Sequence, residues 1–311
     1  MSYLQARMKP LLKADSLVKR YGDILAVNDI SFEINRGEIF GFLGPNGAGK
    51  TTAIKIMSGL LKADSGSVTI DSSDSRSSIG ICPQHIVLWE NLTCLEQVVY
   101  MGRMYDLSSY ESDRRGRSLL EALGLYEYKD RLARKLSGGM QRRLNIILAL
   151  IHSPGIVFLD EPQAGLDPQS RILVRDYIRS IKNLTTVVLT THDMEEAEKL
   201  SDRICIIDKG KLLISGTANE IIRTAGHEDL IEADIEGDIT HDLIPFLDPE
   251  LISDITISGT RISFNNKNPL AAMDNVLRTI KEHNLKVNSL QLRRKSLEDI
   301  FISLTGRSIR E

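Results

Sequence analysis

The apolar residues of the first two hundred positions form either short uninterrupted runs or longer stretches with a helical period. Uninterrupted runs at 38–43, 155–159 and 185–190 predict strands that are buried on both faces, as in a parallel sheet. The stretch 51–60 places Ile54 and Met57 on one helical face, and 169–181 also predicts a helix. Strands that alternate with helices in this way predict an α/β domain.

The segments around these runs complete the predicted domain. Further strands are expected at 11–17, 24–34, 68–70, 79–84 and 204–207. Turns are expected at 19–22, 65–67 and 208–211, and the polar segment 71–78 is expected to be exposed. Residues 92–125 predict helix with breaks at Gly102, Gly116 and Gly124, and 193–200 predicts an acidic helix. The helix that follows Ser137 has apolar residues at i, i+3, i+4 and i+7, which should leave Arg142 and Arg143 on its other side.

The pattern changes at about Ala218. Strands are predicted at 229–235, 252–257, 262–264 and 287–292, and helices at 242–247 and 269–283. The order β-α-β-β-α-β predicts a small ferredoxin-like module. A last helix places Leu297, Ile300, Phe301 and Leu304 on one face. We therefore expect two domains, 1–217 and an accessory α+β domain at 218–311 with a regulatory or dimerising role.

One loop carries the strongest chemical signal. It follows the strand at 38–43 and consists of Gly44, Pro45, Asn46, Gly47, Ala48, Gly49, Lys50, Thr51 and Thr52. The spacing fits G-x-x-x-x-G-K-[ST], in which backbone N–H groups and a helix N-terminus surround the phosphates of a nucleotide. Lys50 would add a positive charge near the β- and γ-phosphates, and the Thr51 hydroxyl would bind Mg²⁺.

Polar residues follow three other predicted strands. Asp160 and Glu161 end the strand at 155–159, at the sheet edge where α/β proteins bind ligands. Asp160 would hold Mg²⁺ and Glu161 would act as general base or orient water. Gln84 and His192 also lie at strand ends, in reach of Mg²⁺ or a γ-phosphate, although by itself such a glutamine is usually a surface amide and such a histidine more often an exposed loop residue.

Two further features are ambiguous when taken singly. Ser137 is a natural N-cap, and Gly138 and Gly139 leave the helix N-terminus open to a phosphate, yet a plain capped helix explains them equally well. Tyr21 precedes the phosphate loop by one hairpin and could stack on an adenine, but an exposed turn tyrosine is the simpler interpretation.

Composition excludes several classes of function. The formal net charge is −3, so no overall field favours nucleic acid or anionic lipid. Three widely spaced cysteines argue against a disulfide framework and fit a reducing cytosol. The N-terminus lacks the apolar core of a signal peptide, and no apolar run approaches the roughly 20 residues that span a bilayer.

Together, the phosphate loop and 136-Leu-Ser-Gly-Gly-Met-Gln-141 just ahead of Asp160 and Glu161 resemble the ATP-binding-cassette ATPases over about 11–217. The resemblance implies a phosphate-loop NTPase with a mixed sheet core and with antiparallel β and α-helical subdomains. It implies ATP and Mg²⁺ as cofactors, with Thr51, Gln84 and Asp160 at the metal. It assigns adenine stacking to Tyr21, catalysis to Lys50, Gln84, Glu161 and His192, and the site-bridging loop to Asp167. It assigns ATP binding in the opposite subunit to Ser137, Gly138, Gly139 and Gln141. Gln163 departs from the family, which usually has Thr or Ser there.

The C-terminal sequence Leu-Glu-Asp-Ile-Phe…Leu-Thr-Gly at 297–306 resembles exporter ATPases of the daunorubicin-resistance-like branch. This implies a homodimer that binds a separate transmembrane permease and lies in the cytoplasm, peripheral to the inner face of the cell membrane. The alternative is a soluble cassette ATPase that acts on nucleic acid, ribosomes or iron–sulfur assembly. The acidic charge and the single cassette argue against it, so we expect no nucleic-acid partner.

Overall fold

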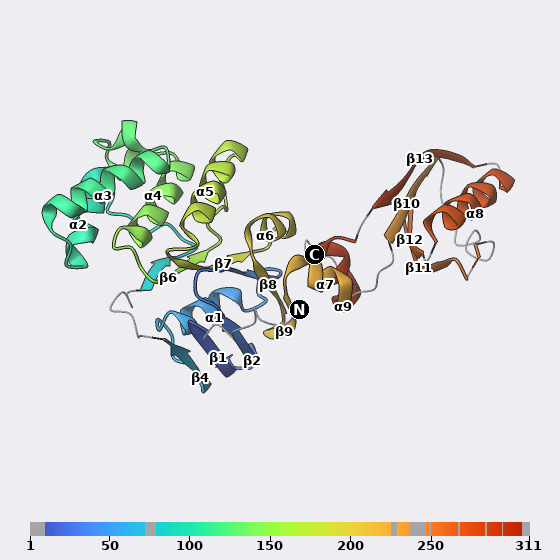
Figure 1. Ribbon diagram of the computed structural model, residues 1–311, viewed down its shortest axis with the longest axis horizontal. Helices are drawn as coiled ribbons and strands as arrows, with labels where there is room; N and C mark the ends of the chain where they lie inside the picture. The colour runs from blue at the N-terminus through green and yellow to red at the C-terminus, as the bar shows by residue number, and fades with distance from the viewer. Residues whose placement is uncertain are drawn as a thin grey trace, which may run out of the picture. The chain divides into compact units, whose positions relative to one another are not determined.

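The computed structural model describes residues 10–71, 79–224, 229–236, 247–248, 250–266, 268–283, 285–293 and 295–306. They form two compact units, one ending at Ala218 and the other beginning at Asn219 (Figure 1). The predicted exposed segment 71–78 lies outside the described residues except for Asp71.

A six-stranded sheet forms the centre of the first unit. Its order is β5 (Ile79–Cys82), β6 (Ile156–Asp160), β7 (Thr186–Thr191), β3 (Ile39–Leu43), β8 (Arg203–Asp208) and β9 (Lys211–Gly216). Neighbouring strands are parallel except for β9, which returns antiparallel to β8 through the predicted hairpin turn. The carboxyl ends of β5, β6, β7, β3 and β8 therefore meet along one edge.

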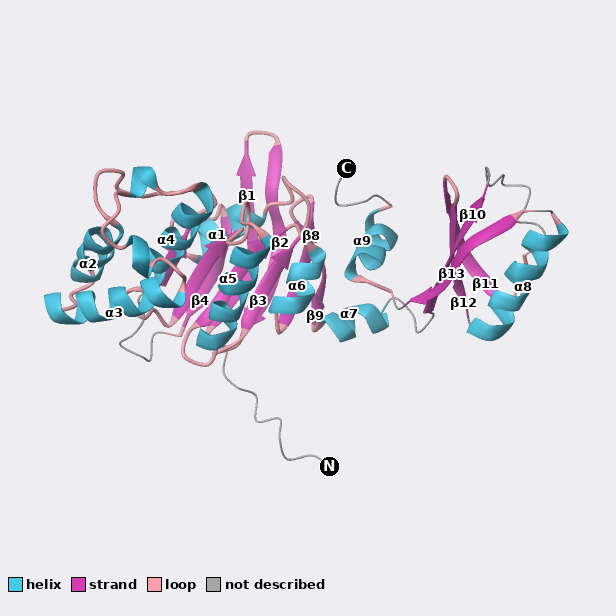
Figure 2. Cartoon of the chain, turned by 90° about the horizontal axis from the view of Figure 1, so that it is seen from above, coloured by secondary structure: helices cyan, strands magenta, loops and turns pink. Residues whose placement is uncertain are grey.

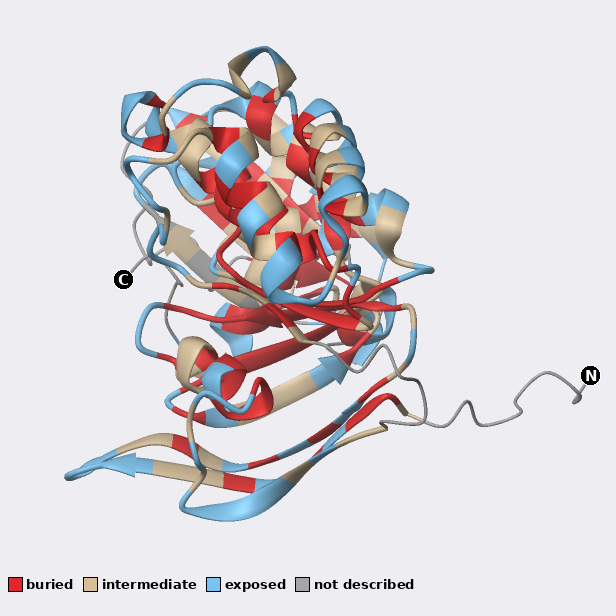
Figure 3. Ribbon diagram, turned by 90° about the vertical axis from the view of Figure 1, so that its left-hand side faces the viewer, coloured by how far each residue is buried: buried red, intermediate tan, exposed pale blue. Residues whose placement is uncertain are grey.

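The two faces of this sheet belong to two hydrophobic clusters. Val157 and Leu159 of β6 pack with α4 (Gly138–Leu150) and α5 (Pro168–Ile181), while Ile156 and Phe158 pack with α1 (Lys50–Met57). Alternate residues of one strand thus serve opposite faces, as the pleat requires. Figure 3 shows the buried strands between the layers. This two-sided burial explains the uninterrupted apolar runs of the sequence.

A three-stranded antiparallel sheet lies beneath α1, in the order β2 (Ile24–Ile34), β1 (Leu12–Tyr21) and β4 (Ser65–Ile70). The turn predicted at 65–67 is wrong, because these residues already belong to β4. Gly66 has φ +84°, and a Cβ there would lie 2.3 Å from the Ser16 carbonyl oxygen. The glycine allows a bulge between two strands rather than a turn.

The helical part contains α2 (Cys94–Met104), α3 (Ser109–Ala122), the 3₁₀ turns Tyr126–Tyr128 and Ala133–Lys135, and α4. The breaks predicted at Gly102 and Gly116 are wrong, since both lie inside helices. A Cβ on Gly102 would lie 2.7 Å from Ser112 Oγ, and one on Gly116 would lie 3.0 Å from Val98 Cγ1. These glycines let α2 and α3 approach each other closely. The break predicted at Gly124 is correct, because α3 ends at Ala122 and Gly124 has φ +64°.

The helix α6 (Met194–Leu200) belongs to the first unit and is capped by Asp193, whose carboxylate accepts from the Glu196 N–H.

The cysteines Cys82, Cys94 and Cys205 are free and buried, and burial raises the pKa of Cys82 to about 12 and that of Cys94 to about 11. No helix in the part of the chain that the structure describes is long and apolar enough to cross a membrane.

The second unit contains an antiparallel sheet in the order β11 (Ile252–Ser258), β12 (Arg261–Asn266), β10 (Asp229–Glu236) and β13 (Lys286–Arg293). The helix α8 (Pro269–Glu282) packs on this sheet, with Val276 and Ile280 against Ile231 and Phe264 (Figure 2). The strand order is that of the predicted ferredoxin-like module. The predicted helix at 242–247 lies outside the described residues except for Leu247.

Two short helices, α7 (Ala218–Thr224) and α9 (Leu297–Thr305), flank this sheet in the sequence. In α9 the residues Leu297, Ile300 and Phe301 are buried, as predicted. Leu304, predicted on the same helical face, is 48% exposed. The buried stripe of α9 spans little more than its first turn.

Candidate functional site

The phosphate loop has the geometry that its glycines predict. It connects β3 to α1, and Gly47 and Gly49 have φ values of +80° and +103°, which glycine adopts without strain. A Cβ on Gly44 would lie 2.2 Å from the Ile207 carbonyl oxygen, and one on Gly49 would lie 2.2 Å from that of Ala26. The loop therefore packs closely against β2 and β8, and a side chain at Gly44 or Gly49 would displace it.

Lys50 begins α1 and folds back over this loop. Its Nζ donates to the carbonyl oxygens of Gly44 at 2.6 Å and Pro45 at 3.0 Å. Burial lowers the pKa of Lys50, although Glu161 and Asp160 nearby act in the opposite direction. The ammonium group is thus partly desolvated beside the loop, where an anion would be attracted strongly.

A cavity of about 480 Å³ opens over the loop. Among the predicted residues its lining contains Asn46, Gly47, Ala48, Gly49, Lys50, Thr51, Thr52, Gln84 and Glu161. Sequence reasoning missed Ile24, Leu25, Ala26 and Lys209, which also line it. Lys209 follows the end of β8, where the same rule that located Asp160 and His192 would have found it.

Tyr21 lies at the tip of the β1–β2 hairpin, opposite Ile24, and is 49% exposed. Ile24 lines the cavity and is 70% exposed, so an apolar side chain stands at its rim. Tyr21 is not part of the lining, and its contact with adenine stays a prediction.

The acids at the end of β6 are held by a residue that the sequence did not indicate. The hydroxyl of Thr190, on the neighbouring strand β7, donates to Asp160 Oδ1 at 2.5 Å and accepts from the Glu161 N–H at 2.9 Å. Glu161 has φ +50°, an unusual conformation for a residue with a side chain, and this second bond supports it. One buried hydroxyl therefore binds both the Asp160 carboxylate and the Glu161 backbone.

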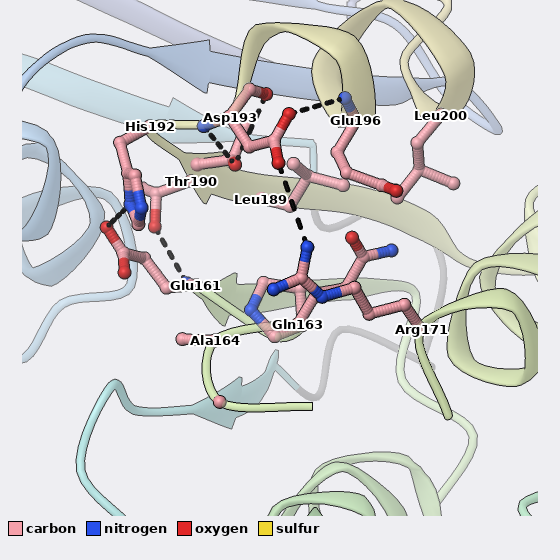
Figure 4. A pocket seen from close by; sticks show the side chains of 13 residues that line it. Glu161, Gln163, Ala164, Arg171, Leu189, Thr190, His192, Asp193, Glu196 and Leu200 are labelled. Atoms are coloured by element: carbon pink, nitrogen blue, oxygen red, sulfur yellow. Dashed lines mark hydrogen bonds and ion pairs between the residues drawn. The ribbon is translucent and has the colours of Figure 1, made fainter. Parts of the chain in front are cut away.

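The side chain of Glu161 lies between two basic groups. Its Oε1 is 3.0 Å from Nδ1 of His192 (Figure 4). The same oxygen is 4.0 Å from Nζ of Lys50. Glu161 is 8% exposed, so few water molecules reach it. Lys50, Glu161 and His192, which span more than a hundred positions of the sequence, thus meet at one point of the fold.

A second cavity of about 140 Å³ lies behind Glu161 and His192. Gln163 lines it, and its buried amide nitrogen has no hydrogen-bond partner among the described residues. Arg171 of α5 donates to the Leu166 carbonyl oxygen and lies 3.9 Å from Asp193 (Figure 4). The helix α5 therefore contacts both the segment after Glu161 and the segment after His192.

The residues assigned to ATP binding in the opposite subunit are called the signature residues below: Ser137, Gly138, Gly139 and Gln141. None of them lines the cavity over the loop. Ser137 caps α4 by accepting from the Met140 N–H at 3.3 Å, and a Cβ on Gly138 would meet nothing within 4 Å. The Gln141 side-chain amide donates to the Ala133 carbonyl oxygen. Asp167 caps α5, and hydrogen bonds from Ser170 lower the pKa of its carboxyl group.

Replacing Thr190 with valine tests the shared hydroxyl. Valine keeps the shape of the side chain but leaves Asp160 and the Glu161 N–H without their partner. We expect the ATP hydrolysis rate to fall roughly tenfold, with unfolding free energy lower by about 2 kcal/mol. Steady-state kinetics and urea unfolding measure both.

Thr186→Val is the matched control for this variant, since Thr186 is buried at the other end of β7 and accepts from the Gly37 N–H. It should lose similar stability and keep its rate. Equal rates in the two variants would contradict the role of Thr190.

Comparison with known proteins agrees with this geometry. The family profile described as "ABC transporter" matches residues 27–164. The linearmycin resistance ATP-binding protein of Bacillus subtilis is 35% identical over 311 residues, which is 97% of this chain and 100% of that protein. The daunorubicin/doxorubicin resistance ATP-binding protein of Streptomyces peucetius is 34% identical, over 95% of this chain and 92% of that protein. The Nod factor export ATP-binding protein I of Ralstonia nicotianae is 35% identical, over 97% and 96%.

Solved structures show the same fold. A structure described as the ATP-binding subunit of an ABC transporter superposes with a TM-score of 0.64 at 29% identity, over 70% of this chain and 93% of that one. A cbiO1 protein from Clostridium perfringens superposes with a TM-score of 0.60 at 28% identity, over 70% and 94%. With these relatives matching along nearly its whole length, the chain belongs to the ABC transporter family, as one of its ATP-binding, ATP-hydrolysing subunits.

Proposed function

We propose that the chain powers a membrane exporter, as a homodimer bound to a separate permease. The relatives named above are a linearmycin resistance protein, a daunorubicin/doxorubicin resistance protein and a Nod factor export protein. Their names share resistance or export, and the similarity extends through the C-terminal unit. The observation that carries the export role is this similarity over nearly the whole chain. The observation that carries the dimer is that the cavity over the phosphate loop has none of the signature residues in its walls.

The separation of loop and signature supports a head-to-tail dimer. The cavity over the loop is open on one side, whereas Ser137 to Gly139 present an uncovered helix N-terminus elsewhere on the same chain. A second copy in reverse orientation would place its α4 N-terminus, with a positive partial charge, against the γ-phosphate. ATP would then hold two chains together, and hydrolysis would release them.

The residues around the cavity fit Mg²⁺ held jointly with a nucleotide. The described residues contain no cluster of three or more His, Cys, Asp or Glu that could hold a metal alone. Mg²⁺ is commonly bound by one or two carboxylates plus substrate phosphates. Asp160 would supply the carboxylate, next to Glu161 in the sequence but outside the cavity lining, and Thr51 and Gln84 would reach the ion from that lining. Bound there, the ion would neutralise charge on the phosphates.

Glu161 and His192 supply the proposed chemistry of hydrolysis. The Glu161 carboxylate would accept a proton from the attacking water, since it lines the cavity and lies beside His192 and Lys50. The Nδ1–H of His192 would donate to the Glu161 carboxylate, 3.0 Å away, which leaves Nε2 to face the γ-phosphate. Lys50 would exchange its two loop carbonyls for phosphate oxygens when ATP binds.

An apolar patch beside Gln84 suits the permease. It comprises Ile86, Val87 and Trp89 after β5, together with Tyr100 and Met104 of α2, all at least 39% exposed. Trp89 and Tyr100 meet edge to face with centroids 5.4 Å apart. Aromatic anchors of this kind dominate binding energy at protein interfaces. A cytoplasmic helix or loop of the permease, with apolar side chains, is the proposed occupant.

Replacing both Trp89 and Tyr100 with serine tests this partner. The double variant should bind the permease roughly 30-fold more weakly, which corresponds to loss of about 2 kcal/mol at an anchor. Its ATP hydrolysis as a free chain should be unchanged. Co-purification in detergent and binding in nanodiscs measure the loss.

Tyr110→Ser is the control, because Tyr110 is 78% exposed on α3 outside the patch. If the wild-type chain associates with no membrane protein, the export role is wrong. If the double variant binds as well as Tyr110→Ser does, the patch is not the contact.

A further inference from the structure

The arginine at position 142 occupies a place that the helical pattern does not predict. It was expected on the polar side of its helix, yet it is 5% exposed within α4. Its Nη1 donates to the Pro83 carbonyl oxygen at 2.9 Å, and its Nη2 donates to that of Gln84 at 2.5 Å. A buried guanidinium with two carbonyl partners holds a chain segment in a defined place, because its planar fork matches only one arrangement.

Asn145 contacts the same segment from the next turn of α4. It is 4% exposed, its Nδ2 donates to Cys82 Sγ at 3.3 Å, and its Oδ1 accepts from the Val87 N–H at 3.4 Å. The last paired residue of β5 is Cys82, so the residues from Pro83 onward lie beyond the sheet ladder. Two side chains of α4 therefore hydrogen-bond to residues 82–87, which we call the Gln84 segment, both before and after Gln84.

The same helix begins with the signature residues. Ser137 caps it, and Arg142 lies five residues further on, roughly 7.5 Å along a rigid helix. The N-terminus of α4 and the Gln84 segment are thus joined by less than two helical turns and two charge-assisted hydrogen bonds.

We propose that Arg142 and Asn145 are positioning residues that make the signature and the Gln84 segment move as one body. The inference rests on the proposed function, in which Ser137 contacts the ATP of the partner subunit and Gln84 lies beside the metal and the permease. Closure on ATP would displace α4, and the Arg142 fork would carry this displacement to Gln84 and to the apolar patch that follows it. Neither residue touches the nucleotide cavity of its own chain.

A double-mutant cycle on the full chain tests the link. Arg142→Met should lower kcat roughly tenfold with KM for ATP unchanged, in the range of coupling through packed networks. Gln84→Ala should lower kcat as well. If Arg142 acts through Gln84, Arg142→Met in the Gln84→Ala background should cost less than about twofold more.

Arg143 provides the matched control. Its Nη1 donates to the Leu123 carbonyl oxygen at 2.8 Å, so it ties α4 to the end of α3 instead. Arg143→Met should combine multiplicatively with Gln84→Ala. Arg142→Lys, which keeps the charge but not the fork, should recover part of the lost kcat.

Hydrogen exchange gives a readout independent of catalysis. Arg142→Met should speed exchange in peptides covering 83–91, whereas Arg143→Met should speed it in those covering 119–125. Asn145→Leu serves as a second probe should Arg142→Met fold poorly. Multiplicative losses in the cycle, or equal exchange at 83–91 in the two arginine variants, would overturn the inference. A different outcome separates this inference from the export role. If the cycle is non-additive but the reconstituted complex transports nothing, only the export role is refuted.

Discussion

Replacing Glu161 with glutamine is expected to lower the rate of ATP hydrolysis roughly 10²–10⁴-fold, the range over which a positioned general base contributes. Glutamine has nearly the same shape, so ATP affinity should be unchanged. The amide cannot take a proton from water, although it still reaches His192, 3.0 Å away in the wild type. Single-turnover hydrolysis and equilibrium binding of ATP measure the two effects separately.

The same variant should accumulate as an ATP-bound dimer, because the γ-phosphate that joins the two chains is no longer removed. Sedimentation velocity with ATP and Mg²⁺ measures its size. Glu198→Gln is the control, since Glu198 is exposed on α6 and undergoes the same chemical change. A Glu161→Gln chain that stays monomeric with ATP would contradict the head-to-tail dimer, and one that hydrolyses normally would contradict the base.

Replacing Lys50 with alanine should weaken ATP binding by roughly two orders of magnitude, or about 3 kcal/mol, as expected for loss of a charged hydrogen-bond donor. The ammonium group is buried, 2.6 Å from the Gly44 carbonyl oxygen, and already inside the cavity that the phosphates would enter. Isothermal titration or fluorescent-ATP displacement measures the dissociation constant.

Lys55→Ala is the matched control, because Lys55 lies on the same helix and is exposed. It removes the same charge from the chain and should leave the affinity unchanged. Thermal unfolding without nucleotide shows that both variants retain the fold. Equal affinity in Lys50→Ala and Lys55→Ala would refute phosphate contact by Lys50.

The central strands β3, β6 and β7 were predictable because they are buried on both faces and so carry uninterrupted apolar runs. The edge strand β9 is half-exposed, lacks such a run and was not predicted. The breaks at Gly102 and Gly116 were not, since a helical glycine that allows close helix packing has the same local sequence as one that ends a helix. Gly66 was mistaken for a turn for the same reason. In each case the deciding fact is what a Cβ would meet, and that atom comes from a distant part of the chain.

The candidate site likewise contains residues that the sequence pattern predicted and residues that it did not. The phosphate loop, Asp160 and Glu161 were recognisable because their spacing is local and their backbone demands are strict. Thr190 was missed because its partners Asp160 and Glu161 are 30 and 29 residues away and meet it only across two paired strands. Ile24 and Lys209 were not predicted as cavity residues, because they line the cavity from β2 and from the turn after β8.

The α/β class, the phosphate loop and the acids at the end of β6 follow from the amino-acid sequence alone, because each depends on residues close together in the chain. The fold had to be seen to learn that Thr190 binds at those acids, which residues form the cavity wall, and that Arg142 binds the Gln84 segment rather than solvent. The physical reason is that a local pattern sets the direction of the backbone, while burial and hydrogen-bond partners depend on segments that meet only after folding.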